Sequence, residues 1–200
     1  MASRDEILRD IRRTTVASLA LPTIEGDWIT YADRPQQFAT SLEFVGGRCH
    51  RVQSVSEIDA VLAQLPTWTS AAKTFSRVTG AGRSTFDLEA VDDPHQLEDV
   101  DFAILPGHFG VAENGAIWVT GDGLKHRAIY FIVQHLAIVL PTEQLVDTMH
   151  QAYTRLSFPG VGFGMFLSGP SKTADIEQSL VIGAHGPRSL NVFLVGNPAR

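Results

Sequence analysis

The chain has 200 residues, of which 44% are hydrophobic and 19% charged, as in globular rather than disordered proteins. Its 22 acidic and 16 basic residues give a formal net charge of −6, and no basic run exceeds Arg12-Arg13. This balance excludes nucleic-acid binding as the main function, because that requires a basic surface. The lone Cys49 supplies neither an internal disulfide nor the about four thiolates of an iron–sulfur cluster. We therefore expect a cytoplasmic protein that carries no cofactor in this chain.

The N-terminal segment is predicted to be a helix with a connecting arm. Ser3 and Glu6 form a capping-box pattern, and Ile7, Leu8 and Ile11 follow at helical spacing. We assign residues 1–34 to this helix and arm and residues 35–200 to one α/β domain. The longest apolar stretch, residues 128–140, is shorter than the roughly 20 residues of a membrane span, so no span is expected.

The first half of the domain alternates between helix and strand. Apolar spacing predicts a helix over 35–45, stopped by two glycines, and then a strand over 49–52. A second capping-box pattern, Ser54 and Glu57, begins a helix that continues to Pro66. Residues 73–78 are predicted to form the next strand.

The second half is richer in buried-type strands, predicted over 101–105, 116–120 and 135–140. Thr142 is predicted to cap a helix that runs through Leu145, Val146 and Met149 to Leu156. Two more strands are expected over residues 164–167 and 191–195. This pattern predicts an α/β fold with a mostly parallel sheet flanked by helices. In such sheets the ligand site lies beyond the carboxyl ends of the strands, here the loops 80–84, 106–115 and 168–187.

Two glycine-containing loops resemble nucleotide motifs without completing them. Gly80-Ala81-Gly82 has Thr85 where a dinucleotide fingerprint needs its third glycine, so we interpret it as a turn. The segment Gly169-Pro170-Ser171-Lys172-Thr173 lacks the glycine before the lysine of a phosphate loop. Its amides, hydroxyls and ammonium group still suit a carboxylate or phosphate, with a plain turn as the alternative.

Two further residues are candidates for acid–base chemistry. His185, between Ala184 and Gly186, is placed to act as an acid, a base or a donor to an anion; a hydrogen-bonded turn residue is the alternative. Glu113, in Glu113-Asn114-Gly115, is a candidate base or nucleophile, or simply the flank of a hairpin turn. The seven histidines show no paired metal-ligand spacing, so no metal is expected.

The blocks Gly169 to Glu177 and Gly183 to Pro187 closely resemble the lactate utilization protein C family, also called the LUD-domain family. This resemblance implies a fold like that of the NagB, ribose-phosphate isomerase and CoA-transferase proteins. It also implies a subunit that acts with iron–sulfur partners of the A and B types in oxidising L-lactate to pyruvate. The resemblance does not settle what chemistry the C protein performs, so whether this chain is an enzyme stays open, as does homo-oligomerisation.

Glu113 carries a second resemblance, to the Ser-Glu-Asn-Gly signature of CoA transferases, in which the glutamate is the nucleophile; here Ala112 replaces the serine. The alternative function is therefore a stand-alone enzyme or binding protein for a small anionic acyl, CoA or sugar-phosphate compound.

The predicted site holds a small carboxylate or phosphate between the two blocks, with Glu113 and His185 as catalytic candidates. Lys172 supplies the charge, and Ser171 and Thr173 supply directional hydrogen bonds. The remaining predicted ligand-binding residues are Gly169, Pro170, Asp175, Glu177 and Gly186. Asp175 and Glu177 either meet the ligand or pair with Lys172 or Arg188.

Overall fold

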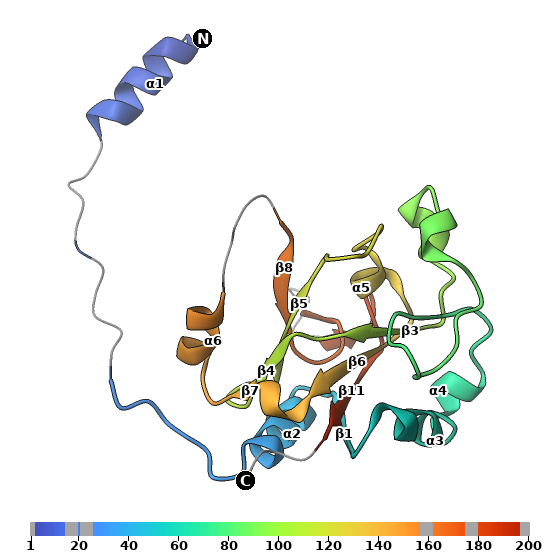
Figure 1. Ribbon diagram of the computed structural model, residues 1–200. Helices are drawn as coiled ribbons and strands as arrows, with labels where there is room; N and C mark the ends of the chain where they lie inside the picture. Colours follow the sequence, from blue (N-terminus) through green and yellow to red (C-terminus); the bar gives the residue numbers. More distant parts are fainter. Residues whose placement is uncertain (1–2, 15–19, 21–25, 157–161, 175–179, 197–200) are drawn as a thin grey trace.

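The computed structural model describes residues 3–14, 20, 26–156, 162–174 and 180–196, which form two sheets, a short β ribbon and several helices (Figure 1). The α-helices are α1 (Arg4–Arg13), α2 (Arg34–Phe44), α3 (Ile58–Leu62), α4 (Pro66–Thr69), α5 (Ile129–Ile132) and α6 (Met149–Arg155). Short 3-10 turns are η1 (Val55–Glu57), η2 (Leu88–Ala90), η3 (Pro94–Leu97) and η4 (Thr142–Gln144). The strands are β1 (Arg48–Val52), β2 (Thr74–Ser76), β3 (Phe102–Pro106), β4 (Phe109–Val111), β5 (Ala116–Thr120), β6 (His135–Pro141), β7 (Leu145–Val146), β8 (Gly164–Leu167), β9 (Lys172–Ala174), β10 (Leu180–Ile182) and β11 (Ser189–Val195).

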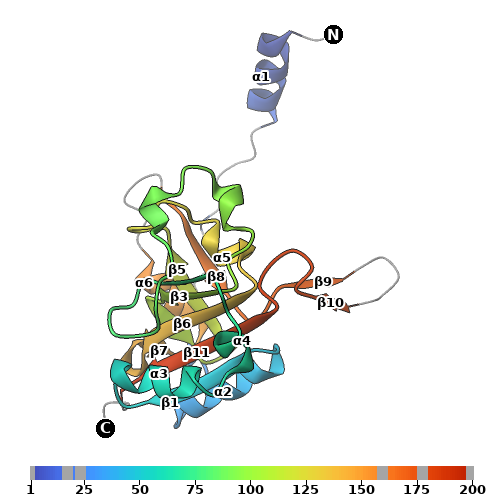
Figure 2. The same cartoon turned by 90° about the vertical axis from the view of Figure 1, so that its right-hand side faces the viewer.

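The main sheet is parallel throughout, with the strand order β1-β11-β6-β3-β2. Its strands are apolar because both faces are covered. Along β6, Leu136, Ile138 and Leu140 face one core, whereas Ala137 and Val139 face the other. Helices α3 and α4 cover this second face (Figure 2). The expected α/β fold with a mostly parallel, helix-flanked sheet is confirmed.

A second sheet, with the order β7-β4-β5-β8, packs over the other face of the parallel sheet. Its β4–β5 and β5–β8 pairs are antiparallel, and only the β4–β7 pair is parallel. Ile117 and Val119 of β5 share a core with Phe38 and Leu42 of α2. Sequence patterning did not predict β4, which has only three residues.

The helix predicted from Thr142 to Leu156 is wrong in its first half. Leu145 and Val146 form strand β7 and pair with β4, and α6 begins only after Thr148. The Thr148 hydroxyl, not that of Thr142, accepts the N-terminal N–H bond of the helix. Leu145 and Val146 are buried within the sheet layer. Pairing with a strand more than 30 residues away has overridden the local helical spacing.

The predicted capping box at Ser54 is also absent. Ser54 makes no side-chain cap bond, and the carboxylate of Glu57 instead accepts the N–H of Gln53 at 2.9 Å. The helix is divided into a 3-10 turn and α3, which ends at Leu62. Pro66 begins α4 rather than simply ending the preceding helix, because a proline fits the first helical turn.

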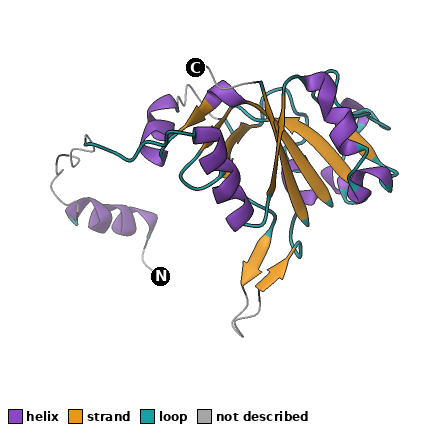
Figure 3. Cartoon of the chain, turned by 90° about the horizontal axis from the view of Figure 1, so that it is seen from below, coloured by secondary structure: helices purple, strands orange, loops and turns teal. Residues whose placement is uncertain are grey.

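The N-terminal capping box is present: Ser3 accepts the N–H of Glu6, and Glu6 accepts the N–H of Ser3. None of the residues of α1 is buried, and Figures 1 and 3 show the helix apart from the sheets. The arm that follows contacts α6, since Trp28 stacks on His150 with 3.7 Å between ring centroids. The division of the chain at residues 34 and 35 stays a prediction.

Candidate functional site

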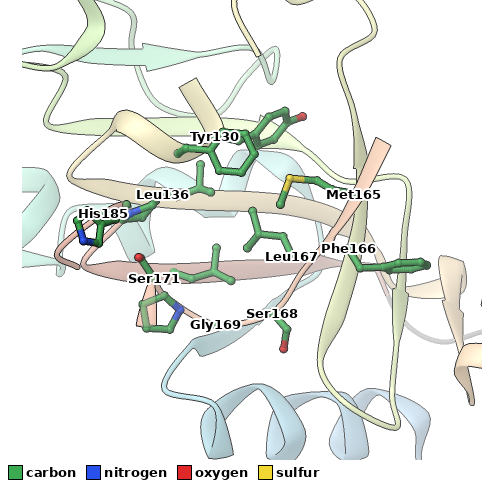
Figure 4. Close-up of a pocket in the computed structure, with 14 residues that line it drawn as sticks. Tyr130, Leu136, Met165, Phe166, Leu167, Ser168, Gly169, Ser171 and His185 are labelled. Atoms are coloured by element: carbon green, nitrogen blue, oxygen red, sulfur yellow. The ribbon is translucent and has the colours of Figure 1, made fainter. Parts of the chain in front are cut away.

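The two motif loops meet at a cavity of about 210 Å³ between the sheets. Leu136 and Leu190, at the beginning of β6 and β11, form its base, and β8 and α5 contribute Met165, Leu167 and Tyr130 (Figure 4). Ser171 and His185 lie next to each other at one end (Figure 4). The walls are therefore mostly apolar, with a hydroxyl and an imidazole as polar groups. Drug-sized ligands occupy pockets of about 300–1,000 Å³, so this cavity suits a small molecule or one end of a larger one.

Backbone hydrogen bonds join the two loops. The Ser171 N–H donates to the carbonyl of Pro187 at 2.9 Å, and the Gly183 N–H donates to the carbonyl of Ser171 at 2.9 Å. Gly186 lies so close to Ser171 that an added Cβ would be 3.0 Å from the Ser171 Cβ and 3.2 Å from the Phe131 carbonyl oxygen. A side chain at this position would therefore crowd Ser171 and the Phe131 backbone, and the role of Gly186 in ligand binding stays a prediction. Ser171, His185, Gly186, Gly169 and Pro170 all line the cavity, as a common site requires.

Lys172 and Thr173 are not among the described residues that line this cavity. Both lie on β9, where Lys172 pairs with Ile182 of β10 in a ribbon that projects from the body (Figure 2). Lys172 is exposed, and its Cε lies 3.9 Å from where a Cβ of Gly46 would be, beside the end of α2. Hence the geometry does not place the Lys172 ammonium group in the cavity. Asp175 and Glu177 lie outside the described residues.

Glu113 is also separate from the cavity lining. One of its carboxylate oxygens accepts the N–H of Met149 at 2.8 Å, and its own N–H donates to the Asp147 carbonyl at 3.0 Å. These bonds make Glu113 a cap for α6. The hairpin alternative describes its position well, since it flanks the tight turn between β4 and β5, where Gly115 has a φ of 67°. The Ser168 hydroxyl donates to the Asn114 carbonyl at 2.9 Å, which links this turn to the cavity only indirectly.

The edge of the sheet differs from the one we predicted. Leu136 and Leu190 are the second residues of parallel strands β6 and β11, so the cavity lies at their amino ends. The rule that ligands bind beyond the carboxyl ends of parallel strands does not apply to these two loops. The His185 loop leads into the amino end of β11, and the Ser171 loop follows β8, which belongs to the other sheet. The loop over 80–84 is a turn, and the missing Cβ of Gly82 leaves room for Trp68 and Ile104.

Two further hollows adjoin the cavity region, and sequence reasoning gave neither of them a role. One, of about 540 Å³, shares His185 and Gly186 with the cavity and also includes Arg188. The other, of about 420 Å³, includes Arg188, His135 and Asp101. His135 is half-buried, and its pKa is lowered first by burial and then by the positive charge of Arg188. In the sequence, Arg188 directly follows His185-Gly186-Pro187 and precedes a predicted buried strand, and this position could have marked it as a candidate site residue.

Tyr130 and Cys49 are packing groups. The Tyr130 hydroxyl donates to the Thr120 carbonyl at 3.1 Å, and burial raises the Tyr130 pKa to about 12. Burial likewise raises the pKa of the Cys49 thiol to about 12, which keeps it protonated and unreactive at neutral pH.

The described residues hold no cluster of three or more His, Cys, Asp or Glu side chains placed to bind a metal ion. Within the same part of the chain, no helix has the length and apolar character needed to cross a membrane.

Comparison with known proteins identifies the family. Residues 72–195, which include the whole cavity lining, match the LUD domain. The chain belongs to the LUD domain family. Curated proteins that resemble it include lactate utilization protein C of Shouchella clausii, 34% identical over 97 residues that cover 46% of this chain and 42% of the relative. Lactate utilization protein C 1 of Bacillus mycoides is 34% identical over 103 residues, covering 45% of this chain and 44% of the relative.

The matched part of this LUD-domain protein therefore spans less than half the length of these curated relatives. A crystal structure of a DUF162 family protein from Deinococcus radiodurans is also similar, with a TM-score of 0.59 and 20% identity. That similarity covers 84% of this chain and 99% of the other. At this level of identity it supports the fold of the LUD domain and nothing more specific.

Proposed function

We propose that this protein acts in lactate utilization, as a cytoplasmic component that supports the oxidation of L-lactate to pyruvate together with iron–sulfur partner proteins. The support for the first part is its similarity to curated proteins named lactate utilization protein C. The assignment of electron transfer to partner proteins is supported by the chemistry of the reaction. Oxidation of lactate to pyruvate releases two electrons and two protons, and a single cysteine falls short of the about four thiolates that hold an iron–sulfur cluster. The proposal therefore assigns the electron carriers to the A-type and B-type partners.

The observation that carries a role for this chain is the cavity between the two motif loops. Ser171 and His185 come from segments 14 residues apart in sequence, yet they meet at the end of one apolar cavity inside the LUD match. A hydroxyl and an imidazole together offer both donors and acceptors to a small hydroxy or oxo acid. We propose this cavity, with the hollow beside His185, as the place where such a compound binds.

The test is growth on L-lactate of a strain of the encoding organism that lacks this protein. We expect growth and pyruvate formation to fail, and the wild-type gene to restore them. A double variant, Ser171→Ala with His185→Ala, should restore them poorly, because it removes both polar groups at modest cost to packing. Gly162→Ala is the matched control, since among the described residues a Cβ there meets nothing within 4 Å.

Normal growth of the deletion strain would overturn the proposal. Turnover of an acyl-CoA or a sugar phosphate by the purified protein alone would instead favour the stand-alone enzyme. Co-purification of the protein from its own cells would test the proposed partners directly.

A further inference from the structure

Arg188 lines both of the hollows beside the cavity. The hollow of about 540 Å³ brings it together with His185, and the hollow of about 420 Å³ brings it together with His135. Both hollows lie at the amino end of the parallel sheet, since Arg188 and Gln134 directly precede β11 and β6. A cation at this position can therefore contact a ligand in either hollow.

The backbone around Arg188 is shaped to hold its side chain. The Arg188 N–H donates to the Gln134 carbonyl at 2.8 Å, which fixes the residue to the neighbouring strand. Gly183 has a φ of 76°, and a Cβ there would lie 2.9 Å from the Arg188 Cα and would overlap its Cγ. The stem of Arg188 thus packs into space that only glycine leaves free. Arg188 as a whole is exposed, so its side chain is accessible from the two hollows that it lines.

Among the described residues, no side chain forms an ion pair with Arg188. Asp99 pairs with Lys73, and an Asp101 carboxylate oxygen accepts the N–H groups of Ala72 and Lys73 at 2.8 and 2.9 Å. The hollows contain one further acidic residue, Glu98, which is exposed. Its carboxylate has neither a hydrogen bond nor an ion pair among the described residues. Arg188 itself makes no side-chain hydrogen bond or ion pair within the described part of the chain.

We propose that Arg188 is the residue that binds the anionic group, a carboxylate or a phosphate, of this protein's ligand, with His185 and His135 on its two sides. This inference rests on the proposed function, in that it names the cation of the same site. A guanidinium group presents a planar fork of donors that matches a carboxylate or phosphate in a bidentate arrangement. Lys172, to which the sequence motif gave this task, lies beside Gly46 instead.

The experiment is titration of the purified full chain with L-lactate, pyruvate and inorganic phosphate, followed by calorimetry and by NMR shifts of the histidine rings. The two carboxylates and the phosphate separate the two sources of anionic charge. We expect Arg188→Gln to weaken binding of the preferred anion by about tenfold or more, the effect of losing a charge-assisted contact. Arg188→Lys should retain part of the affinity.

Two matched variants make the test specific. Lys172→Gln removes the cation of the first motif block and should change affinity by less than about twofold, since Lys172 is not among the described residues that line either hollow. Glu98→Gln removes the competing carboxylate and should tighten binding by about two- to fivefold. Thermal unfolding of each variant establishes that it is folded.

Three results would each overturn the inference: unchanged affinity in Arg188→Gln, an equal loss in Lys172→Gln, or no binding of any of the three anions to the parent protein at about 10 mM. The growth test separates this inference from the proposed function. Dependence of lactate growth on the protein but not on Arg188 refutes the inference alone. Anion binding through Arg188 in a protein that lactate growth does not need refutes the proposed function alone.

Discussion

Replacing Asp147 by asparagine should destabilise the fold by removing the charge that holds the N-terminal arm to α6. The Asp147 side chain is 2% exposed, and its carboxylate accepts bonds from the Nε and Nη2 of Arg34 at 2.9 and 2.8 Å. It also accepts the Tyr31 N–H at 3.1 Å. Asparagine keeps the shape of the side chain but turns an amide N–H₂ group toward the arginine or toward the Tyr31 amide.

The expected loss is about 2–3 kcal/mol in the free energy of unfolding. Removing one partner of a fully buried ion pair costs about 3–5 kcal/mol, whereas exposed pairs contribute about 0–1 kcal/mol. Arg34 is 41% exposed, so solvent screens the pair and places its contribution between these limits. Asp92→Asn is the matched control, because Asp92 is 96% exposed and pairs with Lys125 only at 3.4 Å. That variant should stay within about 0.5 kcal/mol of the parent.

The pKa shift of Asp147 determines how the stability difference between the parent and Asp147→Asn changes with pH. Hydrogen bonds from Arg34 lower the pKa of Asp147 below its ordinary value. Its contribution to stability is therefore fully present above the unfolded-state pKa of about 3.9 and is lost as the pH falls through the folded-state pKa. Other carboxylates titrate alike in both proteins, so the difference between parent and Asp147→Asn isolates this group.

Urea denaturation, followed by tryptophan fluorescence between pH 7 and pH 3, measures that difference. It should be constant from pH 7 to about pH 5 and should shrink as the pH is lowered below about 4. Equal stability of Asp147→Asn and Asp92→Asn at pH 7 would refute the reasoning. So would a difference that does not change with pH down to 3.

Three further outcomes are expected. Gly186→Ala should cost about 1–3 kcal/mol in urea denaturation, because its Cβ has no space beside Ser171, while Gly162→Ala should leave stability unchanged; similar values for the two would contradict the packing. Cys49 should react with iodoacetamide much more slowly in the native protein than in urea at pH 7.5, since its pKa is raised to about 12; rapid native labelling would show that the thiol is accessible. Glu113→Ala should lower stability by about 1 kcal/mol through loss of the helix cap and leave anion binding unaltered, whereas abolished binding measured by calorimetry would return Glu113 to the site.

Local sequence was sufficient for much of the fold. The continuous apolar runs of β6 and β11 predicted the parallel sheet, because strands covered on both faces must be apolar throughout. The capping box at Ser3 formed as expected, since a cap depends only on residues three positions apart. The joining of Ser171 and His185 was likewise anticipated from the two motif blocks that contain them.

Tertiary structure decided what depends on residues distant in sequence. Leu145 and Val146 have helical spacing with Met149, but pairing with β4 made them a strand, because burial in a sheet outweighs a small local preference. The position of the cavity at the amino ends of β6 and β11 followed from a second sheet; its strands β5 and β8 were predicted, but not that they form a sheet separate from the parallel one. Lys172 lies within one motif block and Arg188 directly follows the other. Only the tertiary structure distinguishes them, because the Arg188 stem packs on Gly183, whereas Lys172 lies on the β9–β10 ribbon. The sequence by itself determined the strands of the parallel sheet and the two motif loops that line the cavity, whereas the positions of Lys172 and Arg188 relative to that cavity were decided by how distant segments pack.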